Sequence, residues 1–83
     1  MLHEFETLEE FSVVSTVANT TVKVRLRRQL NYQPSRLTSG PYWLDLRAGS
    51  VHVPHYGVSE PLARDAATRF LLKHVNGIAP PVH

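Results

Sequence analysis

Hydrophobic and polar positions alternate most regularly in the middle of the chain, across residues 21–30. The apolar positions of this segment are Val22, Val24 and Leu26. The positions between and after them are Lys23, Arg25 and Arg27, with Arg28 following directly. A two-residue period is typical of a strand that is buried on one face. The pattern therefore predicts a strand with a core side and a positively charged open side.

A second alternating segment spans residues 42–47, and a shorter one spans residues 51–53. The first places Tyr42, Leu44 and Leu46 on one face and Trp43, Asp45 and Arg47 on the other. Turn-forming residues at Ala48-Gly49-Ser50 separate the two segments, which predicts a β-hairpin. We expect its second strand to end at Pro54, because proline cannot donate a ladder hydrogen bond.

A helix is predicted after Ser59, a residue type that caps helix N-termini with its hydroxyl group. Apolar residues then recur at helical spacing, at Leu62, Ala63, Ala66, Ala67, Phe70 and Leu71. Asn76-Gly77 is a typical helix stop. We expect a loose tail from about residue 78 to residue 83, because chain ends without packing partners are poorly ordered.

The segment from residue 8 to residue 17 supports two interpretations. Thr7-Leu8-Glu9-Glu10 matches a capping box, which favours a helix. The following residues 12–17 are rich in β-branched and hydroxyl side chains, which weaken a helix and favour a strand that turns at Asn19-Thr20. We take the helix as the first interpretation and the strand as the alternative.

These elements predict a single α+β domain that covers residues 1–83. Its small antiparallel sheet has three strands if residues 8–17 are helical, in the order αβββα, and four strands otherwise, in the order ββββα. The C-terminal helix covers one face of the sheet, joined by the N-terminal helix in the first arrangement. The basic face stays open in both.

The helix, three strands, helix order resembles the topology of double-stranded-RNA-binding domains. Residues 59–72, with paired Ala66-Ala67, are similar to the final helix of those domains. Members of that family grip phosphates with a lysine cluster at the start of this helix, where the present chain has Glu60 and Pro61. The RNA-binding residues of the family are therefore not transferred to this chain.

Charge is distributed unevenly along the 83 residues, although the net charge is only +2 at pH 7. The charged residues before Val22 are all glutamates, whereas those from Val22 to Arg47 are cations apart from Asp45. Cysteine is absent, which excludes disulfides and thiolate metal sites. No apolar run is long enough to span a bilayer, and residues 1–6 carry acids where a signal peptide needs bases. We therefore expect a cytoplasmic protein without a membrane partner.

Catalytic and cofactor motifs are not indicated. No nucleophile motif places a serine near a base, and no glycine-rich phosphate loop occurs. The best metal candidate is His52-Val53-Pro54-His55, with His74 as a further ligand. Residues three apart on a strand point to opposite faces, so we expect structural or surface histidines here. The prediction is a protein without enzymatic activity, cofactor or metal site.

The Arg-rich face with nearby aromatic residues remains as the functional signal. Our first hypothesis is a small binding protein that recognises nucleic acid, either DNA or RNA. Phosphates would be bound by Lys23, Arg25, Arg27, Arg28, Arg36 and Arg47, and bases would stack on Tyr32 or Trp43. The alternative is a protein-binding module or small inhibitor, of the kind found in phages and mobile elements, acting on an acidic surface of a larger host assembly. A homodimer formed through an exposed strand edge is a further expectation.

Overall fold

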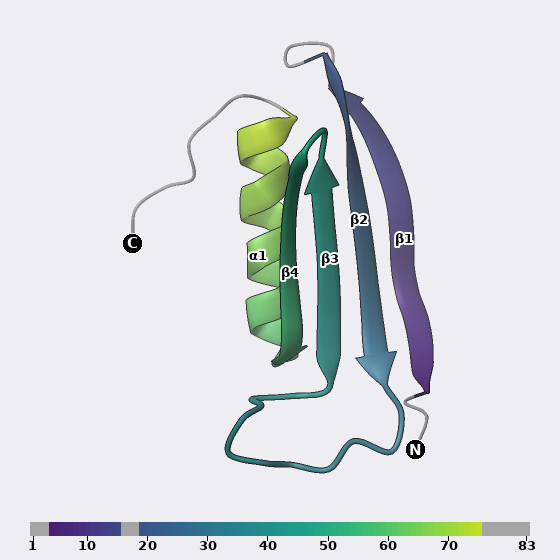
Figure 1. The fold of residues 1–83 in the computed structure, drawn as a ribbon, viewed down its shortest axis with the longest axis vertical. Helices are drawn as coiled ribbons and strands as arrows, with labels where there is room; N and C mark the ends of the chain where they lie inside the picture. Colours follow the sequence, from purple (N-terminus) through teal and green to yellow (C-terminus); the bar gives the residue numbers. More distant parts are fainter. Residues whose placement is uncertain (1–3, 16–18, 76–83) are drawn as a thin grey trace.

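The computed structural model describes residues 4–15 and 19–75. They form a four-stranded antiparallel sheet with a C-terminal helix against one face (Figure 1). The strands lie side by side in chain order, as β1 (Phe5–Ser15), β2 (Thr20–Gln29), β3 (Tyr42–Ala48) and β4 (Val51–Val58), followed by α1 (Glu60–His74). The predicted α+β class is confirmed in its ββββα form.

The first element is a strand, so the predicted N-terminal helix is wrong. Residues of β1 pair antiparallel with β2, with Val13 opposite Val22 and Phe11 opposite Val24. The β-branched residues of this segment fit a pleated ladder better than a helix, and Asn19 allows the turn into β2 with a positive φ of 51°. The chain therefore departs from the topology of double-stranded-RNA-binding domains, because the first helix of that topology is absent from the described residues.

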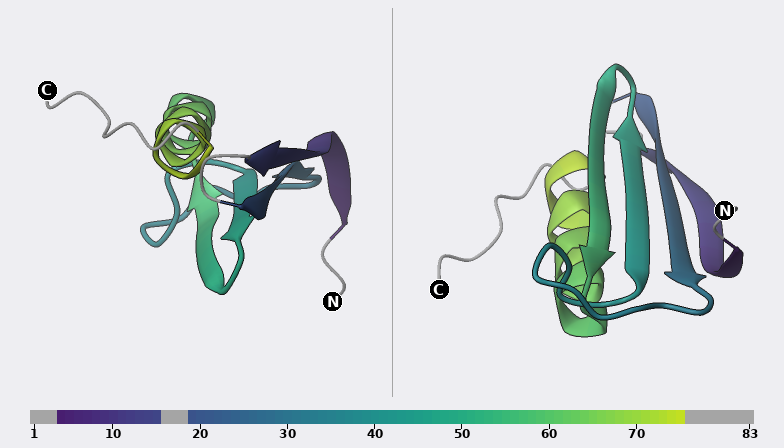
Figure 2. Two further views of the ribbon diagram at one scale, coloured as in Figure 1. Left: turned by 90° about the horizontal axis from the view of Figure 1, so that it is seen from above. Right: turned by 60° about the horizontal axis from the view of Figure 1, so that its bottom comes forward.

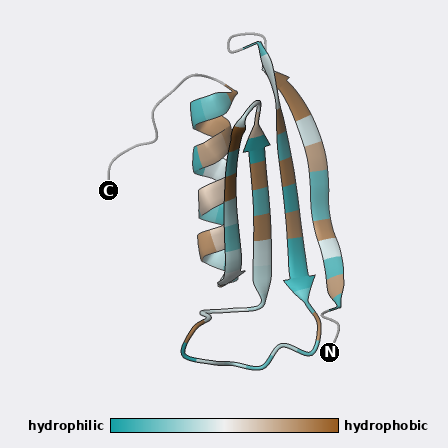
Figure 3. Cartoon of the chain, in the orientation of Figure 1, coloured by the Kyte–Doolittle hydropathy of each residue, from teal (hydrophilic) through white to brown (hydrophobic). Residues whose placement is uncertain are grey.

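The hydrophobic core lies between the sheet and α1. Hydrophobic and hydrophilic residues alternate along β2 and β3 (Figure 3), and the register places their apolar side chains on the same face. The buried core residues are Val22, Val24, Leu26, Leu44, Leu46, Ala48, Ala63 and Phe70. Small alanines on α1 let the helix approach the sheet closely, where it packs over β2, β3 and β4 (Figure 2). The three β2 residues that were predicted to face the core, Val22, Val24 and Leu26, are all buried there.

The start of α1 follows the sequence prediction. The Ser59 hydroxyl accepts a hydrogen bond from the backbone N–H of Leu62 at 3.4 Å, as expected of an N-cap. The predicted stop at Asn76-Gly77 and the loose tail at 78–83 lie outside the described residues. In the part of the chain that is described, no helix combines the length and apolar character needed to cross a bilayer.

Strand β4 continues past Pro54, where a strand end was predicted. Pro54 lies opposite Asp45, and the strand runs on to Val58. Because β4 is an edge strand, the missing N–H of Pro54 removes no bond to a neighbouring strand. The prediction failed because strand order in the sheet, and with it the position of this edge, is a tertiary property.

The connection between β2 and β3 crosses the end of the sheet (Figure 1). It is anchored by backbone bonds, including Ser39 N–H to the Gly57 carbonyl oxygen at 2.8 Å. Gly40 packs so closely that an added Cβ would meet the Val58 carbonyl oxygen at 2.5 Å. The connection therefore needs glycine at this position.

Candidate functional site

The sheet face opposite α1, called the open face below, carries most of the predicted binding residues. Cross-strand partners in an antiparallel sheet point to the same side, so the register defines this face. Its side chains from β2 are Lys23, Arg25 and Arg27, and those from β3 are Trp43, Asp45 and Arg47. The neighbouring edge strands add Glu10 and Ser12 from β1, and His52 and Pro54 from β4. The face is therefore a polar, mixed-charge surface without a covering helix.

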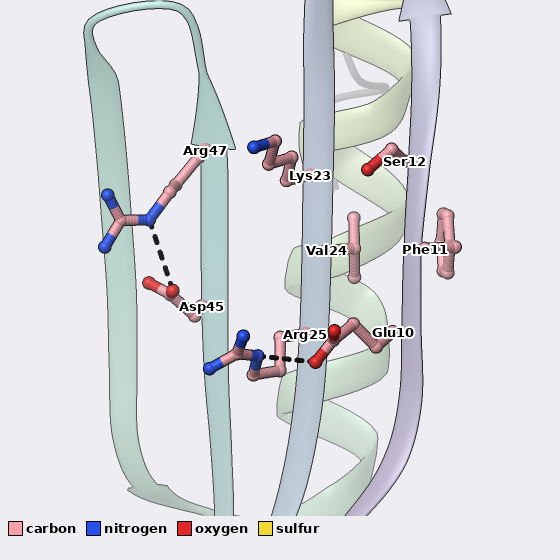
Figure 4. A pocket seen from close by; sticks show the side chains of 8 residues that line it. All are labelled: Glu10, Phe11, Ser12, Lys23, Val24, Arg25, Asp45 and Arg47. Carbon is pink, nitrogen blue, oxygen red and sulfur yellow. Dashed lines mark hydrogen bonds and ion pairs between the residues drawn. The ribbon is translucent and has the colours of Figure 1, made fainter.

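The cations of the open face are partly neutralised by acids of adjacent strands. Arg25 Nε lies 2.7 Å from Glu10 Oε2, and Arg47 Nε lies 3.3 Å from Asp45 Oδ2 (Figure 4). Within the described residues, Lys23 forms no ion pair. Four cations and two carboxylates share the face, which leaves a surplus of two positive charges. The basic face predicted from the sequence thus carries interleaved carboxylates and keeps a positive excess.

Asp45 is the centre of a small polar cluster. Its carboxylate contacts His52 Nε2 as well as the Arg47 guanidinium. Partial burial raises the pKa of Asp45, but the hydrogen bonds from His52 and Arg47 outweigh this effect and leave the pKa below its ordinary value of 3.8. Asp45 is therefore a carboxylate at neutral pH, and it orients the side chains of Arg47 on β3 and His52 on β4.

A shallow depression of about 410 Å³ lies among these charged side chains. Figure 4 shows Lys23, Arg25 and Arg47 around it, together with the carboxylates of Glu10 and Asp45. A surface of this kind can exchange a carboxylate for another anion, because both partners of each ion pair are accessible to solvent.

An aromatic row borders the charged cluster. The Trp43 ring lies between Phe5, with a centroid distance of 4.9 Å, and Tyr56, with a centroid distance of 4.7 Å. Arg27 Cζ lies 4.7 Å from the centroid of the Phe5 ring, within range of a cation–π contact. Tyr56 is the most accessible of these rings, at 57% exposure, whereas Trp43 is half-buried. The accessible aromatic surface of the row is therefore mainly that of the Tyr56 ring, which packs against Trp43.

Two donors in this row have no acceptor among residues 4–15 and 19–75. Arg27 Nε and Trp43 Nε1 are buried and make no hydrogen bond to another described group. Buried unpaired donors are uncommon in proteins, and functional sites are one of the places where they occur. Both atoms lie at the end of the open face where the charged cluster meets the aromatic row.

The structure brings five of the eight predicted binding residues together on the open face, namely Lys23, Arg25, Arg27, Arg47 and Trp43. Arg28 lies on the opposite face, where it bonds Glu6 at 2.6 Å, and this partner raises the pKa of Arg28 above its ordinary value. Arg36 and Tyr32 lie in the connection between β2 and β3, and the Tyr32 hydroxyl bonds Thr38 Oγ1 at 2.8 Å. These three residues do not belong to the cluster.

Phe5 and Tyr56 were missing from the predicted binding residues, although both contact Trp43. The alternation of β4 would have placed Tyr56 beside the hairpin if Pro54 had not been taken as the strand end. For Phe5 no local signal was available, since the strand character of its segment depends on pairing with β2.

The histidines of the predicted metal candidate are separated by the sheet. His52 points to the open face and pairs with Arg47 in register, whereas His55 pairs with Leu44 on the helix side. Among residues 4–15 and 19–75, no group of three or more potential ligands is positioned to hold a metal ion. Comparisons of the chain with protein-family models, with curated proteins and with solved structures find no match. Its function has to be inferred from the chemistry of the open face.

Proposed function

We propose that the open face binds single-stranded nucleic acid. The observation that carries the proposal is the juxtaposition of a positively charged cluster, Lys23, Arg25 and Arg47, with an aromatic row on one uncovered sheet face. Phosphates bind the cations, and unstacked bases stack on the exposed ring of Tyr56 beside Trp43. An uncovered sheet face suits a single strand because bases splayed out on it are accessible to aromatic side chains.

The spacing of the cations supports several phosphate contacts. Lys23, Arg25 and Arg27 alternate along β2, so their Cα atoms are separated by about 6.7 Å from one to the next. Each side chain reaches a different part of a bound backbone. The two guanidinium groups at positions 25 and 27 suit bidentate contact with phosphate oxygens.

The ion pairs on the open face do not prevent this interaction. Exposed pairs such as Arg25–Glu10 contribute only about 0.2–1 kcal/mol each. A phosphate that approaches Arg25 or Arg47 replaces one anionic partner by another at small cost. Lys23 and Arg27 have no ion pair to lose within the described residues.

A specific observation also favours the second candidate, a protein partner. Glu10 and Asp45 interleave with the cations, and a mixed-charge surface complements a protein with charges of both signs better than a polyanion. In that case the face binds a largely acidic surface of a larger assembly, with Arg27, Trp43 and Tyr56 as anchors. The same surface serves both candidates, so binding measurements have to separate them.

The test is fluorescence anisotropy of labelled single-stranded DNA and RNA between about 50 and 200 mM salt. Three phosphate contacts predict a fall of log affinity with log salt of slope about −2, since each contact contributes about −0.7 for single strands. Lys23→Ala is expected to weaken binding and to reduce the slope. Lys73→Ala, which removes an exposed lysine from α1, is the matched control and is expected to change neither.

Absence of binding at the lowest salt concentration would contradict the nucleic-acid proposal. A stoichiometric partner retained from nuclease-treated extract, and lost with Lys23→Ala but not with Lys73→Ala, would instead support the protein-binding candidate.

A further inference from the structure

Strand β1 forms one edge of the sheet (Figure 2). It runs for 11 residues, from Phe5 to Ser15. Its first half carries three glutamates and a β-bulge between Thr7 and Glu9, whereas residues 11–15 contain no charged residue, proline or bulge. Charges, prolines and bulges usually protect sheet edges, because an unprotected edge pairs readily with another strand. The opposite edge, β4, has Pro54 in its middle. The two edges therefore differ in their capacity to accept a further strand.

Two backbone hydrogen bonds at the end of β2 determine which residues of β1 face outward. Gln29 donates its N–H to the Pro41 carbonyl oxygen at 2.7 Å, toward β3, and Leu30 donates to the Glu4 carbonyl oxygen at 2.8 Å, toward β1. Successive residues of a central strand address alternate neighbours, so the even-numbered residues of β2 bond β1. Their partners on β1 are Glu9, Phe11, Val13 and Ser15.

The residues between these partners are Glu10, Ser12 and Val14. By the same alternation, their backbone N–H and C=O groups point away from the sheet. These three residues form a regular row of donors and acceptors along the β1 edge.

We propose that two copies of this chain pair antiparallel through β1, with the two-fold axis at Ser12. Ser12 then faces Ser12 of the second copy, and Glu10 faces Val14 of the second copy on each side of the axis. Each of these outward-facing pairs exchanges two backbone hydrogen bonds. The two sheets join into one, with both open faces on the same side and both helices on the other.

The side chains of β1 are self-complementary in this register. On the helix side, Phe11 lies opposite Val13 of the second copy, and the same contact recurs across the axis. Phe11 is 38% exposed in the single chain. An apolar groove of about 290 Å³, lined by Val13, Thr68, Leu71, Leu72 and Val75, adjoins this position. The paired Phe11 ring of the second copy covers the groove and removes apolar surface from water.

Charge and apolar pairing disfavour the registers whose axis lies nearer the N-terminus. An axis at Glu10 places two carboxylates directly opposite each other, which destabilises a strand pair. An axis at Phe11 places Glu9 opposite Val13 and separates the apolar pair. With the axis at Ser12, Phe11 and Val13 of the two copies meet on the helix side, and on the open side each Glu10 is kept away from the other Glu10 and faces Val14. Self-complementarity of this kind is what an isologous two-fold interface requires, which is why the partner is a second copy.

Analytical ultracentrifugation of the full chain without nucleic acid tests the pairing. The 9.4 kDa chain is expected to sediment with about twice that mass at high concentration. Val14 is 70% exposed, so substitutions there leave the single chain folded. Val14→Glu places a carboxylate beside Glu10 of the second copy and is expected to weaken the dimer about three- to tenfold, because the repulsion occurs twice.

Val14→Lys is the matched variant, since lysine faces the same Glu10 with the opposite charge. Its dimer is expected to be at least as stable as that of the unsubstituted chain. A monomer at every accessible concentration would overturn the proposal, and so would a dimer that responds equally to Val14→Glu and Val14→Lys. Both outcomes are independent of whether the open face binds nucleic acid.

Discussion

Arg27 and Trp43 lie directly opposite each other on β2 and β3, and each has a buried side-chain donor without an acceptor in the described protein. Such a donor costs about 1–3 kcal/mol when it is left unpaired. The pair is retained at the junction of the charged cluster and the aromatic row, where Trp43 packs against Phe5 and Tyr56. This end of the open face therefore carries a local cost to stability.

Replacing Trp43 separates the cost of the indole donor from the benefit of ring packing. Trp43→Phe removes the unpaired N–H but keeps an aromatic ring, so its free energy of unfolding is expected to change by less than about 1 kcal/mol. Trp43→Ala loses the packing against both neighbours and is expected to cost about 2 kcal/mol or more. Urea denaturation measures both changes, and equal costs for the two variants would contradict this account.

Neutralising Glu10 tests whether Arg25 binds phosphate. Glu10→Gln releases Arg25 from its ion pair and raises the net charge of the open face, so nucleic-acid affinity is expected to increase about two- to fivefold at low salt. Asp65→Asn makes the same charge change on α1 by releasing Arg69, and serves as the control. A loss of nucleic-acid affinity in Glu10→Gln, measured by anisotropy, would count against phosphate binding at Arg25.

The pKa of Asp45 predicts a specific response to acid. Because hydrogen bonds from His52 and Arg47 lower this pKa below 3.8 in the folded protein, the unfolded chain binds the proton more tightly. The resulting stabilisation is complete above about pH 5 and is lost as the pH falls through the lowered pKa. The stability difference between the unsubstituted chain and Asp45→Asn is therefore expected to shrink in acid.

Denaturant unfolding at several pH values measures that difference. A difference that stays the same from neutral pH to about pH 3 would show that the Asp45 carboxylate contributes no pH-dependent stability.

Gly40 is expected to be among the least replaceable residues in the connection to β3. In Gly40→Ala the new Cβ meets backbone atoms, the Val58 carbonyl oxygen at 2.5 Å and Ser59 Cα at 2.8 Å, which cannot move independently. We expect a loss of about 2–3 kcal/mol, at the upper end of ordinary single substitutions. Gly49→Ala, in the β3–β4 turn with a φ of +59°, is expected to cost only about 1–2 kcal/mol, mainly from backbone strain, because its new Cβ meets only the Thr20 side-chain oxygen, at 3.2 Å. Thermal unfolding of both variants checks the order, and a milder effect at Gly40 would contradict the close packing.

Local patterns in the sequence determined β2, β3, the start of β4 and the start of α1. The alternation at Val22, Val24 and Leu26 identified the core side of β2, and Ser59 identified the helix start. Both signals can be recognised in the sequence because each depends only on residues close together in the chain. The open face with Lys23 and Trp43 followed from the same repeat.

Only the tertiary structure decided what β1 is and how much positive charge remains on the open face. The β1 segment carries local signals for both a helix and a strand, and the pairing of Val13 with Val22 resolves them in favour of a strand. The same register brings Glu10 to Arg25, 15 residues further along the chain, and Asp45 to His52 across the hairpin. Contacts between distant segments depend on strand order and register, which are set by the packing of the whole sheet rather than by any one stretch of sequence.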